Sequence, residues 1–320
     1  MIWAAWRTQR AQLLTAVLVT LACLVYLLAV GDHQYAVNTA IDRCTGIKRS
    51  SRACEALYNE AAGLHNGQVF GFGLLFVVPI FLGLLLGSGI VSRELQDGTA
   101  RFAFTQGVTR RRWFVAQLGV ATLALLILLG IVTEAAFAWA HDSNNWQARM
   151  LPNVFDRIGI VMFGYGLCAF AVALLLGAVI RRQAWTFAGA ALAVTAIRFA
   201  EQRYLRSDLA PVREIATPAI RDVLYGTGPV GSWVVSLGLA RRGSSRLIPF
   251  EDSGALRPLF RCWARPRPCA LTAQFRNVVV VHTASQFWPI QLAETAVFVA
   301  AALVLAGVCL VAVSRLWLEP

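Results

Sequence analysis

Binding and hydrolysis of a nucleotide by a P-loop require a lysine, and this basic chain contains almost none. Arginine supplies nearly all of the positive charge, and the single lysine, Lys48, lies in Cys44-Thr-Gly-Ile-Lys-Arg-Ser50. A phosphate-binding P-loop has the spacing G-x-x-x-x-G-K-[ST], and this stretch lacks the first glycine and the hydroxyl residue after the lysine. The chain therefore carries no P-loop of its own, and no cofactor or metal site is expected in it.

Other kinds of chemistry are also disfavoured by the placement of the polar residues. The 4 histidines lie far apart in predicted outer segments, at positions His33, His65, His141 and His282. The apolar stretches contain no grouping of His, Ser, Asp or Cys that would build a hydrolase or a transferase. No basic patch interleaved with aromatic residues stands apart from the expected membrane-flanking loops, so nucleic-acid binding is not expected.

The 7 cysteines divide into two groups by their surroundings. Three lie inside apolar stretches, and the other four lie in predicted outer segments, where disulfides can persist. We expect the two local pairs, Cys44–Cys54 and Cys262–Cys269, and the alternative is four unpaired thiols. Neither pair has the C-x-x-C spacing of a zinc site.

Composition places the chain in a membrane. Hydrophobic residues make up 58% and charged residues 14% of the sequence, and the mean hydropathy is +0.60, so apolar surface exceeds what a soluble domain could bury. Six segments are long and apolar enough to cross about 30 Å of hydrocarbon: Ala11–Val30, Val69–Val91, Trp113–Ala140, Ile158–Ile180, Gln183–Ala200 and Phe287–Val313. Arg198 interrupts the fifth segment, near an end from which its side chain could extend to the lipid headgroups.

Charged residues inside membrane spans are candidates for function by default. The predicted spans hold Glu134, in the third, and Glu294, in the sixth. Both lie within about two helical turns of the outer end, so both side chains could reach interfacial water. They are retained as candidates for a translocation route.

Arginines in short loops predict the orientation. Those at one face are Arg7 and Arg10, Arg93 to Arg112, Arg181 and Arg182, and Arg315, whereas the short loop at the other face balances Arg149 and Arg157 with Asp142 and Asp156. Both termini are therefore expected in the cytoplasm. The arginine-rich segment 201–286 is long enough to be translocated regardless of its charge.

The polar stretch Val91–Trp113 connects the second and third predicted spans on the cytoplasmic face. Gly98 can stop the incoming helix, Thr99 can cap a short helix over residues 100–105, and Gly107 and Thr109 can repeat that stop and start. Such a helix would lie across the ends of two spans as a docking handle. The alternative is a solvated connector that only obeys the positive-inside rule.

The segment 201–286 is rich in proline and has no run long enough to span, which predicts a small folded outer subdomain. Trp233–Leu237 and Arg246–Phe250 are typical of a hairpin with a glycine in its turn, and Asn277–Val281 is a further strand candidate. A structural cap and a gate over an exit route are both compatible with this pattern.

The chain resembles the membrane subunits of type-2 ABC transporters, specifically an actinobacterial group. The resemblance rests on Trp3–Leu14, on Glu94–Trp113 with Gly98-Thr99 and Thr109-Arg-Arg-Arg-Trp113, on Arg181-Arg-Gln-Ala184 and on Thr283–Thr295. In that family these are an N-terminal interfacial helix, a coupling segment, a tight inner turn and the entry to the last span.

The resemblance implies an all-α polytopic exporter subunit of the type V fold, with six transmembrane helices and a small mixed α/β extracytoplasmic subdomain between helices 5 and 6. The implied organisation is residues 1–10 as the interfacial helix, 11–200 as spans one to five with outer loop 31–68 and coupling segment 91–113, 201–286 as the outer subdomain, and 287–320 as the last span and tail. Its partners would be a second copy or a paralogue, two cytoplasmic nucleotide-binding subunits that hold ATP and Mg, and the bilayer of a bacterial plasma membrane.

Docking of the ATPase is assigned by the resemblance to the coupling segment, through Glu94, Gly98, Thr99, Arg101, Phe102, Phe104, Arg110, Arg111 and Arg112. Phe102 and Phe104 are apolar anchors that a groove of a soluble partner could bury. The helix dipole disfavours the three arginines at the start of the third span, so either anionic lipid headgroups or acidic residues of the ATPase must favour them.

The expected cargo is amphipathic, drug-like, a peptide or lipid-like. It would pass between spans two and five, where Phe70, Phe72, Phe76 and Phe81 give span two an aromatic character that core or lipid packing explains equally well. Two other classes stay open: a sensor subunit that recruits an ATPase without transport, and a membrane enzyme, for which the spans offer no polar constellation.

Overall fold

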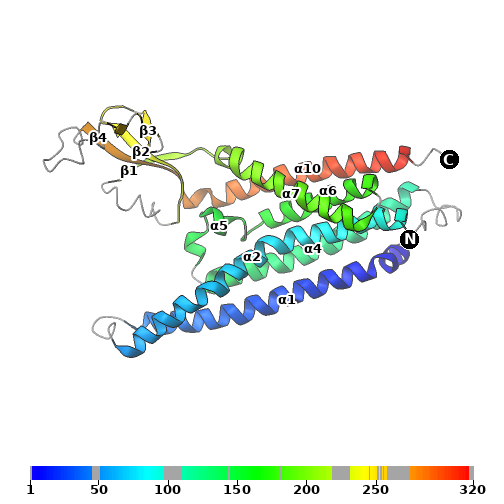
Figure 1. Ribbon diagram of the computed structural model, residues 1–320, viewed down its shortest axis with the longest axis horizontal. Coiled ribbons are helices and arrows are strands. Elements are labelled where there is room, and N and C mark those ends of the chain that lie inside the picture. The colour runs from blue at the N-terminus through cyan, green and yellow to red at the C-terminus, as the bar shows by residue number, and fades with distance from the viewer. Residues whose placement is uncertain are drawn as a thin grey trace.

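Six long helices and a small antiparallel sheet form the described part of the chain (Figure 1). The computed structural model describes residues 2–44, 51–96, 110–142, 145–180, 182–217, 231–244, 246–250, 252, 254, 256–257 and 274–316. The long helices are α1 (Ile2–Asp42), α2 (Arg52–Gln96), α4 (Arg110–Asp142), α6 (Val161–Ile180), α7 (Gln183–Tyr204) and α10 (Phe287–Leu316).

Within the described residues, 5 helical segments are long and apolar enough to cross a membrane: Ala5–Asp42, Arg52–Arg93, Arg112–His141, Val161–Ile180 and Ala284–Val313. The helix α7 is not among them. It packs against α6 and α2, but it carries Arg198, Glu201 and Arg203 toward its C-terminal end. The chain is thus a helical membrane protein, and the fifth predicted span, Gln183–Ala200, stays a prediction.

The first two long helices extend beyond the predicted spans into the predicted interfacial helix 1–10 and the predicted outer loop 31–68. The helix α1 begins at Ile2, so the predicted interfacial helix continues into the first span without a break. It then runs to Asp42 and α2 begins at Arg52, so most of the predicted outer loop 31–68 is helical. The pattern marked apolar runs, whereas a helix continues wherever its own backbone hydrogen bonds can form.

The C-terminal end of α1 and the N-terminal end of α2 are joined by the Cys44–Cys54 disulfide, whose Cα atoms are 5.9 Å apart. This confirms one of the two predicted cysteine pairs. Cys262 and Cys269 lie outside the described residues.

Close helix packing in the middle of the bundle depends on glycine. A Cβ atom added at Gly83 or Gly87 of α2 would overlap the carbonyl oxygen of Gly166 or Phe170 of α6. Gly83 and Gly87 form the G-x-x-x-G spacing that lets two membrane helices approach closely. A larger residue at either position would separate α2 from α6.

The sheet has the strand order β1-β4-β2-β3, with every neighbouring pair antiparallel. Its strands are β1 (Arg213–Thr217), β2 (Trp233–Arg241), β3 (Leu247–Pro249) and β4 (Phe275–His282). The predicted hairpin is confirmed as β2 and β3, with Gly243 in the turn at φ 86°. The further predicted strand is confirmed as β4, whereas β1 was not predicted.

The sheet lies at one end of the bundle, in the chain between α7 and α10 (Figure 1). Both termini lie at the other end, together with the end of α2 and the start of α4. We call these the sheet end and the terminus end. The side of the membrane on which each lies stays a prediction.

Candidate functional site

The predicted coupling segment lies mostly outside the described residues, and so does the short helix expected over 100–105. The predicted docking residues that lie outside the described part of the chain are Gly98, Thr99, Arg101, Phe102 and Phe104. Glu94 lies in the last turn of α2, and Arg110, Arg111 and Arg112 form the first turn of α4. The flanking helices place both ends of this segment at the terminus end (Figure 1).

Neutral side chains connect the helices at the terminus end. The Gln117 amide nitrogen of α4 donates to the Thr8 hydroxyl of α1 at 2.9 Å, and the Gln9 amide donates to the Gln117 backbone oxygen at 3.1 Å. The Gln12 amide donates to the Leu85 carbonyl of α2 at 3.2 Å. No charge is used in these contacts between α1 and its two neighbours.

The four phenylalanines of the predicted translocation route do not share one face of α2. Phe76 is half-buried. The other three rings contact three different helices: Phe70 packs on Tyr26 of α1, Phe72 on Trp139 of α4 and Phe81 on Phe187 of α7, with ring centroids 5.1, 4.8 and 5.7 Å apart. Their role in a route stays a prediction.

The two predicted intramembrane acids have different surroundings. Glu134 of α4 is exposed, whereas Glu294 of α10 has an exposed fraction of 0%. The expectation that both could reach interfacial water is therefore wrong for Glu294. The expectation that Arg198 extends to the headgroups is also wrong, because this arginine is 3% exposed. Both errors have one cause: these side chains find partners in each other.

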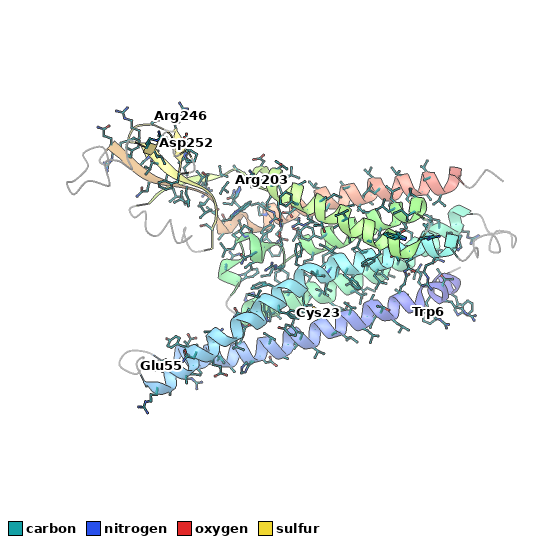
Figure 2. All side chains as sticks on the ribbon, viewed as in Figure 1. Trp6, Cys23, Glu55, Arg203, Arg246 and Asp252 are labelled. Atoms are coloured by element: carbon teal, nitrogen blue, oxygen red, sulfur yellow. A yellow bond between two sulfur atoms is a disulfide. The ribbon has the colours of Figure 1, made fainter. Side chains whose placement is uncertain are left out.

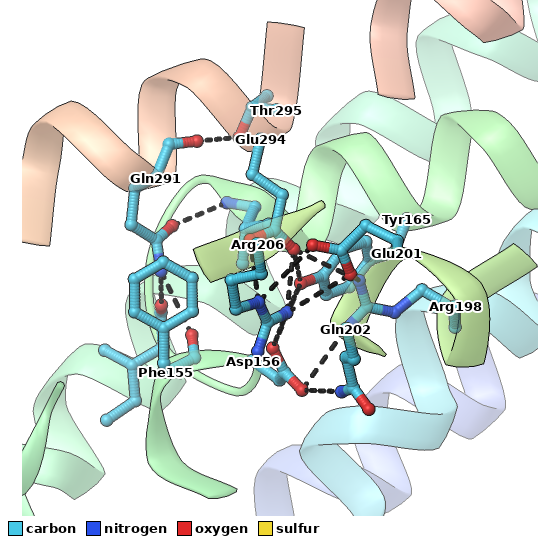
Figure 3. A network of polar contacts seen from close by, with 12 residues as sticks. Phe155, Asp156, Tyr165, Arg198, Glu201, Gln202, Arg206, Gln291, Glu294 and Thr295 are labelled. Carbon is cyan, nitrogen blue, oxygen red and sulfur yellow. Dashed lines mark hydrogen bonds and ion pairs between the residues drawn. The ribbon is translucent and has the colours of Figure 1, made fainter. Parts of the chain in front are cut away.

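Glu294 and Arg206 form the centre of a buried charge network at the sheet end (Figure 3). The Arg206 Nη2 atom lies 2.8 Å from Glu294 Oε1, and its Nε lies 3.1 Å from Glu294 Oε2. This two-point contact matches the planar fork of a guanidinium to a carboxylate. Arg206 also pairs with Asp156 and hydrogen-bonds the Tyr165 hydroxyl at 3.1 Å.

Arg198 binds all three carboxylates of the network. Its Nη1 lies 2.5 Å from Glu201 and 3.1 Å from Glu294, and its Nη2 lies 3.2 Å from Asp156. The guanidinium carbon also sits 3.6 Å from the centre of the Tyr165 ring, a cation–π position. These contacts explain why a cation is stable among packed apolar helices.

Two further polar groups complete the network. The Tyr165 hydroxyl lies 3.1 Å from Asp156 and hydrogen-bonds Glu294, and the Gln202 amide donates to Asp156 at 2.5 Å. Three carboxylates thus face two guanidinium groups, so the ionised network carries one more negative than positive charge.

Five separate elements deliver these side chains. Asp156 ends the short helix α5 (Pro152–Phe155), and Tyr165 lies near the start of α6. Arg198 and Glu201 are three residues apart on α7 and so share a face, while Arg206 begins the 3-10 turn η3 (Arg206–Asp208) that leads to the sheet. Glu294 lies in the second turn of α10.

Gln291 holds α10 in register with these elements. Its amide nitrogen donates to the Phe155 and Ile158 carbonyls at 3.0 and 2.9 Å, and its oxygen accepts from the Val161 backbone at 2.9 Å. Because Gln291 precedes Glu294 by three residues, both side chains leave α10 on the same face. The network therefore joins the base of the sheet to four parts of the bundle.

Sequence reasoning missed this network, although a signal was present. Its five charged residues all lie at the margins of apolar stretches, at ends that the predicted topology places on one face of the membrane. The sequence pattern places Asp156 among the balanced charges of a short loop, but in the structure this side chain is 4% exposed.

The model of the ABC-2 membrane transporter related family matches residues 14–206. This range is more than half of the chain. The protein belongs to the ABC-2 membrane transporter related family. Membership indicates a membrane permease component of an ABC transporter, which is not itself catalytic and which generally pairs with an ABC ATPase. Comparison with curated proteins and with solved structures returned no match.

The match to the ABC-2 family supports the predicted resemblance at the level of a type-2 ABC permease in a multi-pass membrane protein. It ends at Arg206, so it includes four of the five charged residues of the network. The sheet and α10, with Glu294, lie beyond it. The permease therefore completes its buried charge network with a residue from outside the matched range.

Proposed function

We propose that this chain is the membrane-spanning subunit of an ATP-driven exporter, powered by a separate nucleotide-binding subunit that holds ATP and Mg. The observation that carries the proposal is the family match over residues 14–206, which covers the segment 91–113. The sequence contains no P-loop, which supports an ATPase carried by a separate subunit.

The arrangement of the helix ends supports docking at the terminus end. The end of α2 and the start of α4 lie beside both termini and opposite the sheet (Figure 1). If α7 also crosses the membrane, the chain has six spans and both termini lie on one side, and the arginines of Arg93–Arg112 favour the cytoplasm. The nucleotide-binding subunit would then meet residues 91–113, with Phe102 and Phe104 as its apolar anchors.

The opposite end then faces outward, and its chemistry agrees with that assignment. The Cys44–Cys54 disulfide lies at the end of the α1–α2 pair away from the termini (Figure 1), and disulfides persist in oxidising compartments. We propose a second outer pair, Cys262–Cys269, and a bacterial plasma-membrane location.

The proposed transport step is a rocking movement of two six-span subunits, with type V architecture, driven by closure of the ATPase dimer. Neutral amides connect the helices where the ATPase would act, whereas ion pairs hold the far end. Movement applied at the terminus end would thus be transmitted by helices anchored at the sheet end. The cargo we propose is amphipathic, passing between α2 and α7 of each subunit.

The test is affinity purification of the tagged chain from its native membranes. We expect a protein with a G-x-x-x-x-G-K-[ST] motif to co-purify and to hydrolyse ATP. The double change Phe102→Ala and Phe104→Ala should abolish co-purification. The matched control is Phe199→Ala with Tyr204→Ala, since both of these rings are exposed on α7.

Two results would contradict different parts of the proposal. An unchanged complex in the Phe102 and Phe104 variant would refute docking through these residues. The absence of any P-loop protein from the wild-type complex would refute the permease function itself. Directional uptake by inverted vesicles that contain the complex and ATP would then separate an exporter from a sensor subunit.

A further inference from the structure

An apolar groove runs between α1 and α4 at the terminus end. It is an open groove with a volume of about 580 Å³, lined by Trp3, Trp6 and Leu13 from α1 and by Leu123, Ala124 and Ile127 from α4. This volume lies within the range of about 300–1,000 Å³ that small-molecule sites occupy. Because the lining side chains are aliphatic or aromatic, only an apolar part of a ligand fits inside.

Arginine lies on the same face of α1 as the groove. Trp3, Trp6, Arg10 and Leu13 are spaced i, i+3, i+7 and i+10, which places them along one face of the helix. The Arg7 guanidinium lies 5.2 Å from the centre of the Trp3 ring. Both arginines are exposed, so both can bind an anion at the mouth of the groove.

The two helices that form the groove carry no acid along this stretch. The sequence contains neither aspartate nor glutamate from Ile2 to Gly31 or from Arg112 to Thr133. The positive charge of Arg7 and Arg10 is therefore not balanced by α1 or α4 at this end. An apolar slot with a cationic mouth is complementary to a molecule with an acyl chain and an anionic head.

We propose that this groove binds an acyl chain of an anionic phospholipid, with the lipid phosphate held by Arg10 and Arg7. The membrane context favours a phospholipid over a soluble ligand, because the groove opens on the apolar surface of a bundle that spans the bilayer. Trp3 and Trp6 would lie at the headgroup level, where tryptophan is enriched in membrane proteins. Figure 2 shows Trp6 at the end of α1 farthest from the sheet.

Such a lipid would connect α1 to α4 at the end where protein contacts between them are neutral hydrogen bonds. The lipid would thereby contribute to the packing of α1, whose outward side chains Leu14, Leu18 and Leu21 are 62, 65 and 50% exposed. This site is independent of the ATPase partner and of the cargo.

The test is native mass spectrometry of the purified chain after equilibration with equal amounts of dioleoylphosphatidylglycerol and dioleoylphosphatidylcholine. The wild type should retain one phosphatidylglycerol at least about fivefold more strongly than phosphatidylcholine, since one arginine near an anionic surface contributes about that factor. Arg10→Gln should weaken this preference about fivefold. Arg203→Gln, an exposed arginine at the sheet end, should leave it unchanged.

A second variant tests the groove itself. Ala124→Trp should fill the space and remove the retained lipid, whereas Ala301→Trp, at an exposed position of α10, should not. Equal retention of the two lipids by the wild type would overturn the proposal, and so would undiminished phosphatidylglycerol retention in Ala124→Trp. If Ala124→Trp fails to fold, an unchanged lipid preference in Arg10→Gln still overturns it.

Discussion

The two ends of the helix bundle are held together by different kinds of contact. At the sheet end, Arg198 and Arg206 are buried among three carboxylates and a tyrosine. At the terminus end, glutamine and threonine side chains make neutral hydrogen bonds between α1 and its neighbours. Losing one partner of a buried ion pair costs about 3–5 kcal/mol, whereas a neutral hydrogen bond contributes about 1 kcal/mol.

This difference in contacts indicates which end of the bundle can move more easily. A cluster of buried ion pairs has few alternative arrangements, because any displacement of its helices leaves a buried charge without a partner. Neutral amides can exchange partners at smaller cost. The sheet end is therefore expected to be the fixed end and the terminus end the adjustable one.

The largest expected effect is the loss of a cation from the network. Arg206→Gln leaves three carboxylates facing Arg198 alone and should lower the free energy of unfolding by about 3–5 kcal/mol. Glu201→Gln leaves two carboxylates for two guanidinium groups and should cost only about 1–2 kcal/mol. Unfolding by SDS in mixed micelles measures both, with the exposed Arg203→Gln as control, expected within about 0.5 kcal/mol of the wild type. Equal losses of unfolding free energy in Arg206→Gln and Arg203→Gln would show that the network does not stabilise this end of the bundle.

The next effect concerns the α1–α2 pair, whose disulfide-linked ends carry none of the charged residues of the network. Replacing Cys44 and Cys54 by serine should lower the free energy of unfolding by about 2–3 kcal/mol, given a sequence separation of 10 residues. Dithiothreitol should lower the stability of the wild type by the same amount and leave the double variant unchanged. A variant that still responds to the reductant would assign the effect to another disulfide.

A smaller effect is expected at the terminus end. Gln117→Ala removes the side-chain contacts with Thr8 and Gln9 and should cost about 1–2 kcal/mol in the same assay. The control is Thr15→Ala, because the Thr15 hydroxyl is exposed and donates to the Ala11 carbonyl of its own helix. A loss as large as that of Arg206→Gln would remove the distinction between the two ends.

The smallest effect is a pH dependence at the sheet. Burial lowers the pKa of His282 below its ordinary value of 6.5, and its contacts with the Ser207 carbonyl and the Gln286 side chain oppose this shift only in part. The unfolded chain therefore takes up a proton first as pH falls through about 6.5. Stability should be lost from that pH downward until the folded ring is protonated, and it should be independent of this group above it.

Comparing the wild type with His282→Gln over pH 8 to 5 measures this effect. The stabilities of the two proteins should differ by a constant amount above about pH 7 and converge as the pH falls below 6.5. The control Thr15→Ala changes no titratable group, and its stability should differ from that of the wild type by a constant amount over this range. A constant difference for His282→Gln at all pH values would contradict the burial argument.

Much of the fold could be predicted because its signals are local. Apolar length predicted the five helical segments that could cross a membrane, a glycine between two strand-like runs predicted the β2–β3 hairpin, and proximity in sequence favoured the Cys44–Cys54 pair. The strand β1 was missed because its sequence, Arg213-Glu-Ile-Ala-Thr217, has little apolar alternation. The strand forms because its backbone pairs with β4 along its whole length, which a local sequence pattern does not show.

The charge network could not be derived from local patterns, because its partners are distant in sequence. Arg206 and Glu294 are separated by 88 residues, and Tyr165 and Glu294 by 129. Each charge taken alone is compatible with a solvated loop or a side chain that extends to the headgroups. Which carboxylate meets which guanidinium depends on how α5, α6, α7 and α10 pack.

By itself the sequence determined that this chain is a membrane protein without a P-loop, with a polar arginine-rich connection between two apolar stretches and with two cysteines, Cys44 and Cys54, that are close in sequence. These properties follow from composition and from the spacing of residues that are close together in the sequence. The tertiary structure alone decided that Asp156, Arg198, Glu201, Arg206 and Glu294 form ion pairs with one another in a single buried cluster. The physical reason is that a buried charge is stable only beside its partner, and only the packing of distant helices brings the partners together.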